Sequence, residues 1–134
     1  MNKIIALLIL CALGYFSYKP VVAFADRSRY SLSQIESKPI PRRAALTLWQ
    51  DVALENCGEA QSLHNISPEQ CREIVNKRHE SCSASSAGTV PETIAQSGQL
   101  RALGRAYLGC ATPYYFCNGV EVRSEQEVKA QCKR

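Results

Sequence analysis

The sequence predicts a small, mostly α-helical domain of three to four helices, stapled by disulfides and carrying one short β-hairpin near Asn118-Gly119. Three observations support this fold class. Apolar residues recur at helical spacing behind helix-start motifs, an Asn-Gly pair separates two strand-like runs, and cysteines are frequent for a chain of 134 residues. Together they predict one disulfide-stabilised helical domain over residues 41–134, which follows two N-terminal segments of different character.

The first of these segments, residues 1–25, has the composition of a secretory signal peptide. Lys3 precedes an apolar run over 4–16, and Ala23-Phe24-Ala25 supplies the small-residue pattern of a cleavage site. The apolar run is shorter than the roughly 20 residues that span a bilayer. Positive charge is heavier after the segment than before it, so an uncleaved N-terminal membrane anchor is the alternative. The polar, Ser-rich stretch over 26–40 predicts a flexible leader.

The cysteines indicate that the protein resides in an oxidising compartment. Removal of the signal peptide takes Cys11 away and leaves an even number of candidates for disulfides, namely Cys57, Cys71, Cys82, Cys110, Cys117 and Cys132. An even count in a small exported chain favours disulfides formed in an oxidising environment. Cys71 and Cys82 lie roughly 16 Å apart along a continuous helix, so they cannot bond to each other. A fold-back between two helices favours the pairing of Cys57 with Cys71.

The first two helices are predicted over 41–58 and 67–82. The first carries an apolar stripe wide enough for a core face, and Trp49 lies within that stripe as a core residue. The second begins with a capping box, in which Ser67 and Gln70 satisfy each other's free backbone N–H groups. These helices carry three of the cysteines and organise the domain.

A third helix is predicted after a small-residue loop over 83–88. Thr89 and Glu92 have the spacing of a capping box, and a helical pattern follows to about Cys110. Gly104 lies inside this pattern, where glycine lowers helix propensity by about 1 kcal/mol relative to alanine. We therefore expect Gly104 to allow close packing of a neighbouring element.

The chain ends in the hairpin and a short helix. An Asn-Gly pair between strand-like runs is a strong hairpin signal, because both central residues of the turn take positive φ. An isolated hairpin is marginal in water, so we expect this one to pack on the helices and to be fixed through Cys117. Ser124 and Glu127 form a further capping box, which opens a helix tied to the body through Cys132.

The sequence offers little for catalysis. His64 and His79 are predicted as surface or helix-face residues rather than bases, and oxidised cysteines leave no thiol nucleophile. The sequence also lacks the spacings of zinc sites, phosphate-binding loops and paired redox cysteines. Basic and acidic residues are interleaved, and the net charge of +4 falls to +2 when Lys3 and Lys19 are removed with the signal. We predict no catalytic residue, no metal, no cofactor and no nucleic-acid partner.

The candidate contact with another protein is the aromatic run Tyr114, Tyr115 and Phe116, because aromatic side chains are enriched at the centres of protein interfaces. Strand alternation would bury one or two of these rings and leave another outward, while the alternative is that all three pack internally. The sequence thus predicts an exported, periplasmic or secreted, binding protein of inhibitor or immunity type. Two alternatives stay open: a membrane-anchored structural component of a cell-envelope or secretion machine, and a small secreted enzyme or toxin that uses His64 or His79. Membrane contact is expected only if the N-terminal segment is not cleaved.

Overall fold

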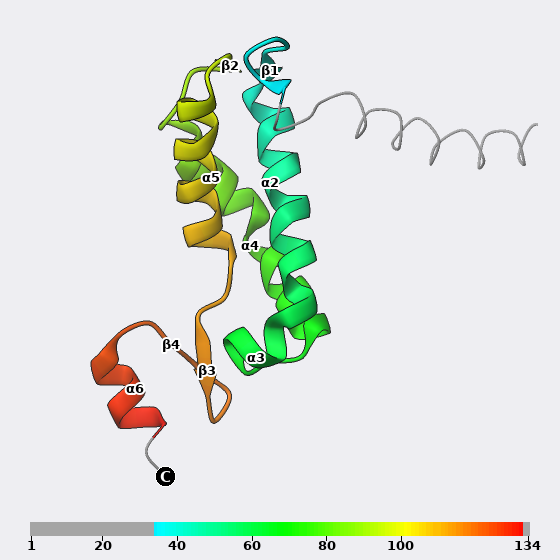
Figure 1. Ribbon diagram of the computed structural model, residues 1–134. Helices are drawn as coiled ribbons and strands as arrows, with labels where there is room; N and C mark the ends of the chain where they lie inside the picture. The colour runs from blue at the N-terminus through cyan, green and yellow to red at the C-terminus, as the bar shows by residue number, and fades with distance from the viewer. Residues whose placement is uncertain (1–33, 133–134) are drawn as a thin grey trace, which may run out of the picture.

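Three long helices pack together in the computed structural model, which describes residues 34–132 (Figure 1). They are α2 (Arg42–Asn56), α4 (Pro68–Ala87) and α5 (Ser97–Ala111). Short elements connect or follow them: η2 (Cys57–Glu59), α3 (Ala60–His64), α6 (Glu125–Gln131), β1 (Ile40–Pro41), β2 (Thr93–Ile94), β3 (Tyr115–Cys117) and β4 (Val120–Val122). Strands β1 and β2 pair antiparallel, as do β3 and β4. The predicted helical, disulfide-stapled domain with one β-hairpin is confirmed.

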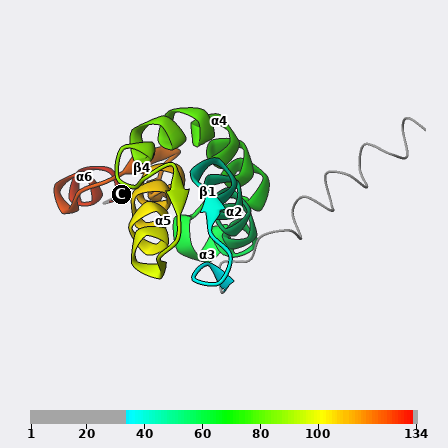
Figure 2. The same ribbon diagram turned by 90° about the horizontal axis from the view of Figure 1, so that it is seen from above.

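The hairpin and α6 lie at the opposite end of the molecule from β1 and β2 (Figure 1). Figure 2 shows α6 to one side of the three long helices rather than among them. Within residues 34–132, no helix combines the length and the apolar character needed to cross a membrane. The predicted signal peptide or anchor at 1–25 lies outside the described residues.

The capping box at the start of α4 forms as predicted. The Ser67 hydroxyl accepts from the backbone N–H of Gln70, and the Gln70 side chain accepts from the backbone N–H of Ser67. The predicted end of this helix was wrong, because 83–87 are helical rather than a loop. The buried side chains of Cys82 and Ser86 lie one turn apart, and α4 packs along α5 there. Packing against a neighbouring helix overrides the weak helix propensity of the serines.

The capping box predicted at Thr89 and Glu92 was also wrong. The Thr89 hydroxyl donates to the backbone carbonyl of Ser86 at the end of α4, so it closes that helix instead of opening the next. The chain then forms β2, in which Ile94 pairs with Ile40 of β1, and α5 begins only at Ser97. The long-range pairing has no local signal in the sequence.

The flexible leader predicted over 26–40 is anchored to the helices at Ile35 and Ile40 in the part that the structure describes. Ile35 and Ile40 are 2 % and 1 % exposed and belong to the core shared by α2 and α5. The polar composition of the segment concealed these two anchoring side chains. Its earlier part, 26–33, lies outside the described residues.

The packing of α2 against α5 depends on a close approach between Trp49 and Gly104. Trp49 is partly buried against the main core, as predicted, and a Cβ atom built at Gly104 would overlap its ring. The expected packing role of Gly104 is therefore confirmed.

The second core lies at the other end of α2 and consists of Ala53, Cys57, Ala60, Ile66, Cys71 and Val75.

All six predicted cysteines form disulfides. Cys57 bonds to Cys71 across the α2–α4 connection, with their Cα atoms 5.5 Å apart, which confirms the one pairing favoured by the sequence. Cys82 of α4 bonds to Cys110 of α5, so Cys71 and Cys82 have separate partners as expected. Cys117 of β3 bonds to Cys132, which follows α6. Three disulfides in a domain of this size indicate an oxidising environment.

Candidate functional site

The hairpin has the predicted turn and a register that divides its side chains between two faces. Asn118 and Gly119 take φ values of 51° and 80°, as a two-residue hairpin turn requires. Tyr115 pairs with Val122, Phe116 with Glu121, and Cys117 with Val120. Because opposite residues point to the same side, we call the face of Tyr115, Cys117, Val120 and Val122 the outer face, and the face of Phe116 and Glu121 the inner face.

The inner face attaches the hairpin to the helices. The Arg78 guanidinium of α4 donates two hydrogen bonds to the Glu121 carboxylate, at 2.7 and 3.2 Å. The Phe116 ring packs on the second core, and its backbone carbonyl accepts from Nδ2 of Asn65 at 2.9 Å. The ion pair is largely removed from water, since the two side chains are 23 % and 15 % exposed. Two polar attachments and one aromatic contact therefore fix the position of the hairpin.

Glu121 is the electrostatic centre of this attachment. Burial acts to raise its pKa, but hydrogen bonds from Arg78, from the backbone N–H of Tyr114 and from Arg123 stabilise the carboxylate more strongly. The net result lowers the pKa of Glu121 to about 2. The carboxylate thus stays charged over the whole physiological range of pH.

Sequence reasoning did not find Arg78, Glu121 and Asn65 as the residues that place the hairpin. A signal existed for Glu121, which alternates with Val120 and Val122 and so must face the opposite side from both valines. A carboxylate on the side that faces the helices requires a cation or several N–H donors. Nothing in the local sequence identifies which residue of the preceding helices supplies them.

The three aromatic residues predicted to contact a partner lie in different surroundings. Tyr114 and Tyr115 are 42 % and 45 % exposed, whereas Phe116 is partly buried on the inner face. The guanidinium of Arg123 lies over the Tyr114 ring, 5.0 Å from its centroid, which orients the ring. The structure therefore presents two adjacent tyrosines to solvent beside one anchoring phenylalanine.

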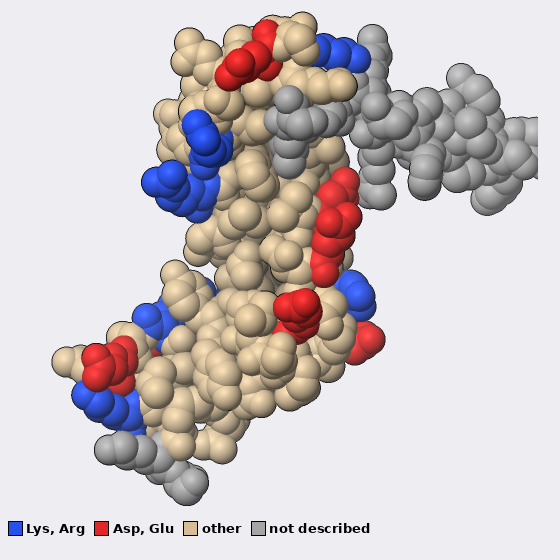
Figure 3. Space-filling view, viewed as in Figure 1, with Lys and Arg blue, Asp and Glu red and all other residues tan. Residues whose placement is uncertain are grey.

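Exposed apolar side chains are concentrated at this end of the molecule. Among residues 34–132, the large hydrophobic side chains that are mainly exposed are Leu63, Tyr114, Tyr115, Val120 and Val128. They belong to α3, to the hairpin and its approach, and to α6. Figure 3 shows this end projecting to one side below α5, with charged side chains of both signs around it. Clustered exposed apolar groups with a polar surround are typical of protein-binding surfaces.

The two histidines lie apart from the two tyrosines in the sequence and have different surroundings. Nδ1 of His79 lies 2.8 Å from the hydroxyl of Tyr107, whose side chain is fully buried on α5. Burial raises the pKa of Tyr107 to about 12, so its hydroxyl stays protonated. Burial lowers the pKa of His64 at the end of α3, although the charge of Glu121 acts in the opposite direction. His79 therefore links α4 to α5, and the proposed use of either histidine in catalysis stays a prediction.

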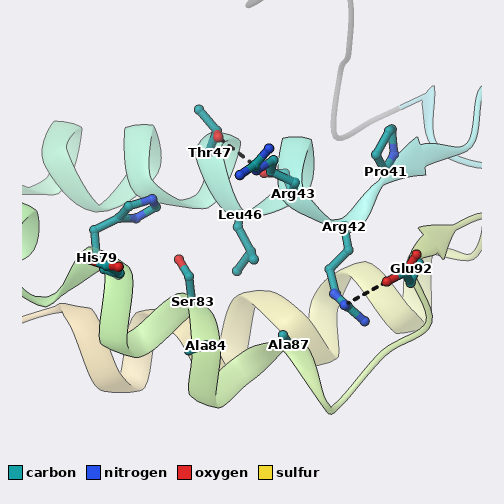
Figure 4. A pocket seen from close by; sticks show the side chains of 11 residues that line it. Pro41, Arg42, Arg43, Leu46, Thr47, His79, Ser83, Ala84, Ala87 and Glu92 are labelled. Carbon is teal, nitrogen blue, oxygen red and sulfur yellow. Dashed lines mark hydrogen bonds and ion pairs between the residues drawn. The ribbon is translucent and has the colours of Figure 1, made fainter.

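A groove of about 760 Å³ runs between α2 and α4. Figure 4 shows Leu46, Ser83 and Ala87 along it, with His79 at one end and the ion pair of Arg42 with Glu92, 3.6 Å long, at the other. The Ser83 hydroxyl is buried without a hydrogen-bond partner. Within the described part of the chain, no three histidine, cysteine or acidic side chains are grouped closely enough to hold a metal ion.

Comparisons of the chain with protein-family models, with curated proteins and with solved structures found no match. The geometry of the hairpin end therefore carries the functional inference.

Proposed function

We propose that this protein is an exported, disulfide-rich binding protein that contacts another protein through the exposed tyrosines of its hairpin. The observation that carries the proposal is the pair Tyr114 and Tyr115, which are consecutive in the chain and 42 % and 45 % exposed, on a fixed support. Tyrosine combines a large apolar area with a hydroxyl that finds a hydrogen-bond partner on the other protein. An inhibitor or immunity-type factor that covers a site on its partner fits this arrangement.

The support of the tyrosines favours tight binding. The hairpin is held on the helical body by the ion pair of Arg78 with Glu121 and by the Phe116 contact with the second core, and the Cys117–Cys132 disulfide bonds it to the end of α6. A surface already fixed in its binding conformation loses little conformational entropy when the complex forms. Side chains on a rigid hairpin therefore convert more of their buried area into affinity than the same residues on a mobile loop.

Capture of partners from the native compartment tests the proposal. The double variant Tyr114→Ser with Tyr115→Ser should lose the partner that the unchanged protein retains. The loss of thermal stability should be small, because both side chains are exposed and a surface contact such as that of Tyr114 with Arg123 contributes only about 0.5–1 kcal/mol. Arg101→Ser is the control, since Arg101 is exposed near the start of α5 and lies outside the exposed apolar surface at the hairpin end. Equal capture by the double variant and by the unchanged protein would refute the role of the tyrosines.

Export is tested by the intact mass of the protein from its producing cells, with and without reduction and alkylation. A mass that begins at Asp26 and gains six alkyl groups only after reduction supports a cleaved signal and three disulfides. A mass that retains 1–25 and the disulfides favours the membrane-anchored alternative. Alkylation of any of the six cysteines from Cys57 to Cys132 without reduction would contradict the exported location, whereas a retained Cys11 would be labelled in the anchored form.

A further inference from the structure

We propose that the Cys117–Cys132 disulfide is redox-sensitive and can be reduced selectively by a dithiol. When this bond is broken, α6 detaches and the outer face of the hairpin becomes exposed. An effect of this reduction on the binding of a partner protein rests on the proposed function, because the newly exposed face includes Tyr115. The opening itself does not depend on that function. The expected detachment of α6 follows from its weak noncovalent attachment and from the positions of the three disulfides in the fold.

Helix α6 covers part of the outer face. Cys117 and Val122 are 6 % and 3 % exposed on this face, yet neither belongs to either core cluster of the helical body. The body contacts the opposite, inner face through Phe116 and Glu121. Helix α6 packs on β4 and is bonded to Cys117, so it is the element positioned to shield these two side chains.

The noncovalent attachment of α6 is weak. It has seven residues, and none of its side chains is buried. Helices shorter than about 12 residues are marginal in water unless tertiary packing stabilises them. Besides the disulfide, two exposed hydrogen bonds attach α6: Nδ2 of Asn118 donates to the carbonyl of Gln131 at 2.7 Å, and the backbone N–H of Arg123 donates to the carboxylate of Glu127 at 2.5 Å. The ion pair of Lys129 with Glu125 lies within the helix and does not attach it to the hairpin.

The other two disulfides lie within the helical body. Cys57 and Cys71 are 0 % and 1 % exposed inside the second core. Cys82 is 1 % exposed on α4, and its partner Cys110 on α5 is partly buried. Cys110 and Cys132 are both only partly buried, so exposure alone does not distinguish these two bonds. The Cys82–Cys110 bond joins α4 to α5, which pack along each other, whereas Cys132 follows α6, which has no buried side chain and can move away from the hairpin. Access of the attacking thiolate controls the rate of disulfide exchange. We therefore expect Cys117–Cys132 to be reduced first.

The reaction balances with one dithiol. A thiolate of the reductant attacks Sγ of Cys132, the bond to Sγ of Cys117 breaks, and Cys117 leaves as a thiolate that takes up a proton. The second thiol of the reductant then attacks the mixed disulfide and releases Cys132 as a thiol. Two electrons and two protons pass to the protein, and the dithiol becomes a cyclic disulfide.

The test is graded reduction of the full chain with dithiothreitol, followed by alkylation and mapping of the labelled cysteines by mass spectrometry. We expect a species labelled only at Cys117 and Cys132, with helical circular dichroism largely retained. In this species tryptic cleavage at Lys129 should rise by about tenfold or more, while cleavage at Lys77 within α4 stays unchanged. Binding of an apolar fluorescent dye should rise in parallel.

The variant that combines Cys117→Ser with Cys132→Ser should show the same cleavage at Lys129 without any reductant. Simultaneous labelling of all six cysteines, earlier labelling of either of the other two pairs, or selective reduction with no gain in cleavage would each overturn the proposal. The outcome is independent of the tyrosine variants, which are compared in the oxidised protein. Failure of one proposal is therefore distinguishable from failure of the other.

Discussion

Replacement of Glu121 by glutamine is expected to lower the free energy of unfolding by about 3 kcal/mol at pH 7. The pKa of Glu121 falls from its ordinary value of 4.5 to about 2 in the folded protein. Each pKa unit corresponds to about 1.4 kcal/mol of preference for the charged form, which gives the quoted magnitude. The change also leaves Arg78 without its carboxylate partner at a site where the arginine side chain is 23 % exposed.

The pH dependence of this effect has a defined sign. Because the folded pKa lies below the unfolded one, the unfolded chain binds more protons between pH 4.5 and about 2. The stabilisation by Glu121 is therefore fully present above pH 4.5 and is lost as the pH falls toward 2. The Glu121→Gln variant lacks the titrating group, so its stability should approach that of the unchanged protein near pH 2.

Urea unfolding at several pH values between 2 and 7 measures the loss of unfolding free energy in the Glu121→Gln variant and its dependence on pH. Glu125→Gln is the matched control, because the ion pair of Glu125 with Lys129 is exposed and should contribute less than about 1 kcal/mol. Amide exchange adds a local observation, since the backbone N–H of Tyr114 donates to Glu121 and should exchange faster in the Glu121→Gln variant. If the free energy of unfolding changes with pH equally in the Glu121→Gln variant and in the unchanged protein, the reasoning is refuted.

Two further predictions concern the helices. Gly104→Ala should lower the melting temperature, because overlap with Trp49 costs about 1–3 kcal/mol and outweighs a gain of about 1 kcal/mol in helix propensity. Gly109→Ala, in the same helix with no atom within 4 Å of the added Cβ, should raise it; an equal shift for both would disprove close packing at Gly104. Ser67→Ala should cost about 1 kcal/mol in urea unfolding by removing the cap on the N–H of Gln70, and an unchanged midpoint would exclude a stabilising role for the capping box.

The elements that the sequence predicted correctly are those with local causes. The capping boxes at Ser67 and Ser124 and the turn at Asn118-Gly119 involve residues three or fewer apart, so the chain carries the whole signal within a few positions. The Cys57–Cys71 pairing was predicted for the same reason, because a short helix–helix connection fixes the distance between its ends.

The features that the sequence did not predict depend on distant partners. Ile40 and Ile94 are 54 positions apart, and their pairing turns the expected leader and the expected helix start into a two-stranded sheet. In the candidate functional site, too, the features with local causes were predicted and those that depend on distant residues were not. Strand alternation predicted that one ring of the aromatic run would face outward without identifying which one, and the attachment of Glu121 to Arg78 required the three-dimensional structure.

The most direct test of the proposed function is site-specific photo-cross-linking in the cells that produce the protein. A photoreactive aromatic amino acid is placed at Tyr115 in one variant and at Thr47, which lines the groove between α2 and α4, in another. Binding through the hairpin predicts a discrete cross-linked adduct with one protein from position 115 and none with that protein from position 47. An adduct from position 47 alone would place the contact in the groove and contradict the account.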